Sequence, residues 1–173
     1  MKKIIILLFL SLSLSSPAFA DKGFDLYQEG NFKGAAREWI KEARNGSKSA
    51  QYNLGIIYST GEGVPKDLRN SLYWYEKSAK QGNKDALNAL GKIYYYGNDI
   101  VKSDYSKAYE YFFKSSKKDN ANSVYFLGRL YEFGDGVNRN LPKALTNYRT
   151  SALAGVPAAQ YRYGTFFESG KGG

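Results

Sequence analysis

Apolar and small side chains recur four residues apart along most of the chain. Ala50, Leu54 and Tyr58 follow one another at this spacing, and Ser71, Tyr75 and Ala79 do so further on. An α-helix has about 3.6 residues per turn, so residues four apart lie on one side of it. The segment that precedes the first glycine-rich stretch lacks the β-branched run that is typical of a buried strand. The pattern therefore predicts an all-α protein.

The pattern also repeats along the chain. The stretch AQYNLGIIYSTGEGV, which begins at Ala50, recurs in altered form from Ala86 and Ser123, and begins again at Ala159. Each copy carries an internal glycine, and these four anchor glycines stand 36, 37 and 36 residues apart: Gly55, Gly91, Gly128 and Gly164. A period of this length is typical of repeats that stack into a solenoid.

Each copy reads as a helix, a glycine-containing loop, a second helix and a short turn. We expect Asp67, Asp104 and Asn140 to precede the second helices, because their side-chain oxygens can accept hydrogen bonds from unpaired backbone amides. Gly82 and Gly155 are expected to end second helices in the left-handed conformation. The anchor glycines would lie inside first helices, where glycine costs about 1 kcal/mol relative to alanine. Close approach of a neighbouring helix would offset that cost.

These elements divide the chain into six segments. They are a signal peptide at 1–20, a capping hairpin at 21–47, full repeats at 48–83, 84–120 and 121–156, and an incomplete repeat at 157–173. The capping hairpin has two helical halves around Gly30 and Asn31 and lacks the long glycine loop. Because the last repeat stops before its second helix, either the chain is a truncated array or its end pairs with a partner, and we favour truncation.

The G-x-G pattern at Gly61 and Gly63 has two interpretations. A phosphate-binding loop follows a β-strand and opens a helix, whereas here the glycines follow a helical segment and recur at Gly134 and Gly136. A left-handed turn that ends a helix explains both the position and the recurrence. We therefore expect a turn, and no nucleotide site. In the 84–120 repeat, Asp99 stands in place of the second glycine in a longer loop.

The N-terminal segment and the composition narrow the function further. Residues 1–20 combine two lysines, an apolar run and the ending Ala-Phe-Ala, which predicts export with cleavage between Ala20 and Asp21, to the periplasm or outside the cell. The chain has no cysteine and no histidine. It therefore lacks a thiol nucleophile and the commonest general base and metal ligand. We predict no catalytic residue, no cofactor and no metal site.

The formal net charge of +9 is spread along the chain rather than clustered. No run of five or six like charges suggests a nucleic-acid tail. We therefore predict no nucleic-acid partner, and no stable membrane span once the signal peptide is removed.

The repeat resembles the Sel-one-like repeat (SLR) family, a relative of the tetratricopeptide repeats. The resemblance is clearest in residues 50–82, at Leu54, Gly55, Tyr58, Gly61, Gly63, Val64, Asp67, Trp74, Tyr75, Ala79 and Gly82. The chain departs from the pattern at Asp99, Asp119 and Ser123. The resemblance implies a right-handed superhelical solenoid of antiparallel helix hairpins. It also implies an adaptor that binds other proteins, in bacteria often at the envelope or in contact with a host.

A binding face can be predicted from the same periodicity. If Ala50, Leu54 and Tyr58 face the core, Tyr52, Ile56 and Ser59 lie about 140° away on another face of the first helix. In tetratricopeptide arrays this face lines the concave groove. The predicted groove residues are Tyr52, Ile56, Ser59, Asn88, Lys92, Tyr95, Tyr125, Arg129, Glu132 and Tyr161. Such a groove would suit a peptide or domain that carries acidic and apolar side chains.

Two other interpretations remain open. One is an envelope enzyme or peptidoglycan-associated hydrolase, with β-lactamase-like activity as claimed for a cysteine-rich branch of the family. The other is a structural role in envelope maintenance. Acidic pairs such as Glu29 and Glu38 could be an acid/base pair for glycan cleavage, but solvated charges explain them more simply.

Overall fold

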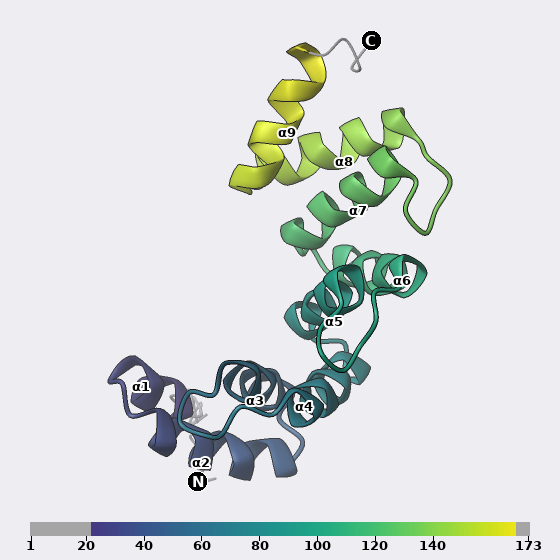
Figure 1. The fold of residues 1–173 in the computed structure, drawn as a ribbon. Helices are drawn as coiled ribbons and strands as arrows, with labels where there is room; N and C mark the ends of the chain where they lie inside the picture. Colours follow the sequence, from purple (N-terminus) through teal and green to yellow (C-terminus); the bar gives the residue numbers. More distant parts are fainter. Residues whose placement is uncertain (1–21, 169–173) are drawn as a thin grey trace, which may run out of the picture.

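A computed structural model of the protein describes residues 22–168. In that range the only regular elements are nine helices (Figure 1). They are α1 (Lys22–Gln28), α2 (Phe32–Arg44), α3 (Lys48–Thr60), α4 (Leu68–Lys80), α5 (Lys84–Tyr96), α6 (Tyr105–Ser116), α7 (Ala121–Phe133), α8 (Leu141–Leu153) and α9 (Pro157–Glu168). The prediction of an all-α solenoid is confirmed. The predicted signal peptide and its cleavage between Ala20 and Asp21 lie outside the described residues.

The helices form a curved stack of antiparallel pairs. Each helix packs against the next one along the chain, and α3 also contacts α5, which in turn contacts α7. Figure 1 shows the array as an arc in which α3, α5 and α7 lie along the inner side and α4 and α6 along the outer side. The first helices α3, α5 and α7 therefore lie along the concave side, and all ten predicted groove residues belong to first helices.

Side-chain caps set where the second helices begin. Asp67 Oδ1 accepts hydrogen bonds from the backbone amides of Arg69 and Asn70 at 2.9 and 3.0 Å. Asp104 and Asn140 cap α6 and α8 in the same way, so all three predicted N-caps are confirmed. These contacts satisfy amides that the helix itself leaves unpaired.

Three of the four anchor glycines admit an aromatic ring from the second helix of the same repeat. A Cβ atom added to Gly55 would lie 2.4 Å from the Tyr75 ring, and one added to Gly128 would lie 2.7 Å from the Tyr148 ring. Gly91 meets Phe112 in the same way. The expected close approach is confirmed at these positions. At Gly164, in α9, a Cβ would have no neighbour within 4 Å among the described residues.

The glycine loops are turns that fit against the preceding hairpin. Gly61 and Gly134 end α3 and α7 with φ of 86° and 78°. A Cβ added to Gly63 would lie 2.4 Å from the Phe32 carbonyl at the start of α2, so only glycine fits there. In the longer loop with Asp99, the Asn98 side chain instead accepts from the amides of Ile100 and Val101.

Buried serines join the two helices of each repeat. Ser78 Oγ donates to the Lys48 carbonyl at 2.6 Å, and Ser115 and Ser151 donate to the Lys84 and Ala121 carbonyls at 2.7 Å. Each of these serines stands one residue before the small residue expected from the four-residue spacing, as Ser78 does before Ala79. A strict four-residue spacing drifts around a helix of 3.6 residues per turn, so the buried stripe returns after three residues instead of four.

Candidate binding groove

Two hollows lie between neighbouring first helices of the array. The α3–α5 hollow has a volume of about 310 Å³ and includes Tyr52, Ser59, Asn88 and Lys92 of the predicted residues. The α5–α7 hollow has a volume of about 550 Å³ and includes Tyr95 and Arg129. Sizes in this range are typical of ligand sites. The repeat thus brings predicted residues from neighbouring first helices together, but into two separate hollows.

Much of the polar chemistry of the α3–α5 hollow is already used within the protein. Ser59 Oγ donates to the Ile56 carbonyl at 2.7 Å, and Asn88 Oδ1 accepts from Ser123 Oγ at 3.0 Å. Ile56 packs against the core cluster around Tyr75. Tyr52 is half-buried, and this burial, with the nearby Asp85 carboxylate, raises the pKa of its hydroxyl. Lys92 is exposed, with Nζ 5.7 Å from the centroid of the Phe126 ring.

The α5–α7 hollow is built from aromatic rings around one guanidinium. Arg129 Cζ lies 5.8 Å from the centroid of the Tyr95 ring and 5.3 Å from that of Phe133. Tyr95 is only 7% exposed and packs edge-on against Tyr105 at the start of α6. Phe133 is 49% exposed, and its neighbour in the hollow, Tyr96, is 65% exposed.

Arg129 retains an unsatisfied donor in this setting. Its Nε is buried and has no hydrogen-bond acceptor among the described residues. Burial by itself would lower the pKa of the guanidinium, but the hydroxyls of Tyr95 and Tyr125 outweigh it and raise that pKa. The group therefore stays positively charged, and its hydrogen bond with Tyr125 contributes to this.

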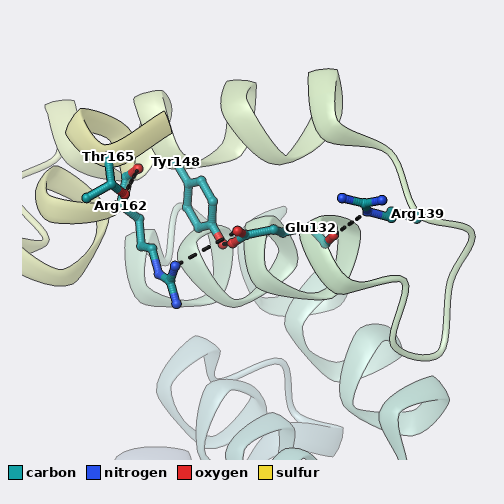
Figure 2. A network of polar contacts seen from close by, with 5 residues as sticks. All are labelled: Glu132, Arg139, Tyr148, Arg162 and Thr165. Atoms are coloured by element: carbon teal, nitrogen blue, oxygen red, sulfur yellow. Dashed lines mark hydrogen bonds and ion pairs between the residues drawn. The ribbon is translucent and has the colours of Figure 1, made fainter. Parts of the chain in front are cut away.

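The Glu132 side chain joins neighbouring helices and is largely buried, so it contributes little to the surface of the groove. It is 6% exposed, and Tyr148 donates its hydroxyl to Glu132 Oε2 at 2.7 Å. Figure 2 shows Tyr148 from α8 and Arg162 from α9 converging on this carboxylate, with the Arg162 guanidinium 3.9 Å away. Arg139 Nε donates to the Glu132 backbone carbonyl at 3.0 Å. Burial and the bond to Glu132 raise the pKa of Tyr148.

The two remaining predicted residues differ in accessibility. Tyr125 is half-buried between the rings of Phe126 and Tyr148, where it joins two core clusters. Tyr161 is 71% exposed in α9. Sequence reasoning missed Tyr96, Tyr105, Phe133 and Asp135, which all line the α5–α7 hollow. Tyr96 and Phe133 directly follow predicted positions, so a face one residue wider would have included them.

The described residues contain neither a cluster of metal ligands nor a membrane-spanning helix. Between 22 and 168, no group of three or more histidine, cysteine, aspartate or glutamate residues is placed to hold a metal ion. No helix in that part of the chain is both long and apolar enough to cross a membrane.

Comparison with known proteins identifies the repeat. The model of the Sel1 repeat family matches residues 48–83, 84–120, 121–156 and 157–173. The chain belongs to the Sel1 repeat family. Its three close glycine–aromatic contacts and its glycine turns are therefore features of a Sel1 repeat array.

Similar proteins come from viruses, fungi and bacteria. A sel1-like repeat-containing protein, L21 of Acanthamoeba polyphaga mimivirus, is 33% identical over 131 residues, which are 76% of this chain and 23% of L21. Chitin synthase regulatory factor 4 of Schizosaccharomyces pombe is 36% identical over 76 residues, or 43% of this chain and 12% of that protein. The chain thus spans less than a quarter of the length of either relative.

A solved structure shares the fold closely. The c5321 protein, a protective antigen present in uropathogenic Escherichia coli strains that displays an SLR fold, superposes with a TM-score of 0.79 at 32% identity. The match covers 87% of this chain and 33% of c5321.

Proposed function

We propose that this chain is a non-catalytic adaptor that holds an extended segment of a partner protein along the concave sides of α3, α5 and α7. The observation that carries the proposal is that two hollows, one beside α3 and α5 and one beside α5 and α7, together contain six of the ten predicted groove residues. The S. pombe relative is named as a regulatory factor of another protein, which is consistent with a binding role.

The chemistry of the groove favours a partner with acidic and apolar side chains. Lys92, Arg129 and Arg162 all lie over aromatic rings on this side of the array. Arginine and tyrosine are enriched among the residues that dominate interface energies. Cations that are held over aromatic faces can pair with carboxylates while the rings pack against apolar groups.

We place this activity in the periplasm or outside the cell. The support is the N-terminal sequence, in which two lysines precede an apolar run and the ending Ala18-Phe19-Ala20. Export with cleavage before Asp21 would present the array to envelope or external proteins.

Partner capture by paired variants tests the adaptor role. The full chain is crosslinked in the cells that produce it and recovered together with its partners. The groove variant Lys92→Ala/Tyr161→Ala removes an exposed cation from α5 and an exposed ring from α9. The control Lys77→Ala/Tyr73→Ala removes the same residue types from α4, a helix of the outer side of the arc, where Lys77 Nζ lies 5.5 Å from the centroid of the Tyr73 ring.

We expect a partner that is recovered with the wild type and the control, and that is depleted at least tenfold with the groove variant. Equal recovery with both variants would reject the groove as the binding surface. Loss with the outer variant alone would move the interface to the convex side.

A further inference from the structure

The α5–α7 hollow differs from the α3–α5 hollow in the chemistry it offers. Lys92 and Arg129 occupy the same position in consecutive repeats. Lys92 reaches into solvent, whereas the Arg129 guanidinium lies over two rings and its Nε is buried. The α5–α7 hollow is also the one lined by the largely exposed rings of Tyr96 and Phe133.

The charge of Arg129 indicates which ligand group the hollow can hold. The Arg129 side chain lines the hollow and its guanidinium lies over the rings of Tyr95 and Phe133. A carboxylate is the acceptor that best matches a guanidinium in both charge and geometry. A ligand carboxylate in the hollow would therefore pair with the Arg129 guanidinium.

The rings determine what should accompany that carboxylate. Tyr96, Tyr105 and Phe133 are 65%, 38% and 49% exposed, and together they line a hollow of about 550 Å³. Clustered exposed rings favour an aromatic side chain, which can pack edge-on or offset against them. The hollow is large enough for such a side chain and a neighbouring acidic one.

We propose that the α5–α7 hollow is an anchor site for a peptide segment in which an acidic residue stands next to an aromatic one. The proposal rests on the adaptor function above and names the feature of the partner that this part of the groove recognises. Arg129 pairs with the carboxylate, and the rings of Tyr96, Tyr105 and Phe133 hold the aromatic side chain.

The charges around the hollow favour an anionic ligand and determine the side on which its carboxylate binds. Arg162 lies over the same Phe133 ring as Arg129 but pairs with the Glu132 carboxylate at 3.9 Å, so Arg129 is the cation that remains for a ligand. Asp135 lines the hollow as well. Its negative charge repels a ligand carboxylate, so the acidic residue binds on the Arg129 side.

Short peptides provide a direct test with the full chain as recovered from cells. The probe is acetyl-Gly-Asp-Phe-Asp-Gly-amide. Three controls replace both aspartates by asparagine, both aspartates by lysine, or the phenylalanine by alanine. Binding is followed in ¹H–¹⁵N correlation spectra, where the Arg129 side-chain signals report whether a ligand binds beside its guanidinium.

Matched variants separate this site from the rest of the groove. We expect Arg129→Gln to weaken binding of the acidic probe at least tenfold, and Lys92→Gln, at the same position one repeat earlier, to change it less than twofold. Asp135→Asn should tighten binding about twofold to fivefold, because it removes a like charge from the lining of the hollow. A misfolded variant could not produce that gain.

The outcomes decide the proposal. It is supported if the acidic probe shifts the Arg129 side-chain signals and the variants rank as stated. It is overturned if the lysine peptide binds better, if no peptide binds, if Asp135→Asn weakens binding, or if both glutamine variants lose affinity equally. Because the capture experiment leaves Arg129 and Asp135 intact, a positive capture result with a negative peptide result would retain the adaptor role and reject this anchor.

Discussion

At the residue scale, the four anchor glycines occupy the same position of the repeat but have different surroundings. Gly55, Gly91 and Gly128 each admit a ring from the following helix, whereas Gly164 has no such neighbour. The close approach could be predicted because glycine inside a helix is unfavourable unless something compensates for it. The identity of the compensating ring depends on a residue about 20 positions later in the chain, which helical periodicity alone does not specify.

Alanine substitutions at Gly128 and Gly164 should have different effects on the free energy of unfolding. We expect Gly128→Ala to lower the free energy of unfolding by more than about 2 kcal/mol, because the new Cβ would overlap the Tyr148 ring. Gly164→Ala should leave it unchanged or raise it by up to about 1 kcal/mol, because only helix propensity changes. Urea denaturation followed by circular dichroism measures both. Equal effects of the two substitutions would contradict the close-packing explanation.

The groove residues show where prediction from sequence ends. Helical periodicity correctly placed Lys92, Arg129 and their neighbours on first helices that line the inner side of the arc. It could not show that Tyr148 and Arg162 engage the Glu132 carboxylate, since these partners lie on two other helices. Which groove side chains remain free for a ligand is decided by such tertiary contacts.

At the scale of elements, the turn between α6 and α7 departs from the others. Gly82 and Gly155 adopt φ of 76° and 85° at the equivalent turns, whereas Asp119 adopts φ of 58°. Aspartate tolerates the left-handed region better than most residues, but it still carries strain that glycine avoids. The sequence showed the missing glycine, and the structure shows that the turn keeps its shape without it.

Restoring glycine at this turn should stabilise the array. We expect Asp119→Gly to raise the free energy of unfolding by about 0.5–1 kcal/mol, net of the added freedom of the unfolded chain. Gly155→Ala is the matched control: its Cβ would meet nothing within 4 Å, so its expected loss of about 1 kcal/mol reflects backbone conformation alone. Thermal and urea unfolding measure both changes. A loss of stability in Asp119→Gly would show that the aspartate contributes more than its backbone strain costs.

At the scale of the whole molecule, the buried tyrosines of the repeats predict that the fold loses stability at alkaline pH. Burial is the main cause that raises the pKa of Tyr75 from its usual 10.0 to about 12, and burial also raises that of Tyr148. The unfolded chain therefore releases these protons first. The stability they contribute is complete below pH 10 and is lost as the pH rises from 10 towards 12.

We expect the free energy of unfolding to fall steeply above pH 10, with Tyr75 contributing up to about 1.4 kcal/mol per pH unit. Tyr75→Phe keeps the ring against Gly55 but cannot ionise, so its stability should fall less steeply over the same interval. Urea titrations at several pH values between 9 and 12 measure the two slopes. Parallel curves for the wild type and the variant would show that Tyr75 is not the group responsible.

The central claim is that a partner protein lies along the concave side of the array, and site-specific photocrosslinking tests it most directly. A photoreactive phenylalanine derivative replaces Tyr96, which is 65% exposed in the α5–α7 hollow, or Tyr73, which is 48% exposed on the outer side of α4. Both sites exchange one exposed aromatic side chain for another. After illumination of intact cells, the account predicts a covalent protein adduct from position 96 and none from position 73. An adduct from position 73 alone, or none from either position, would contradict it.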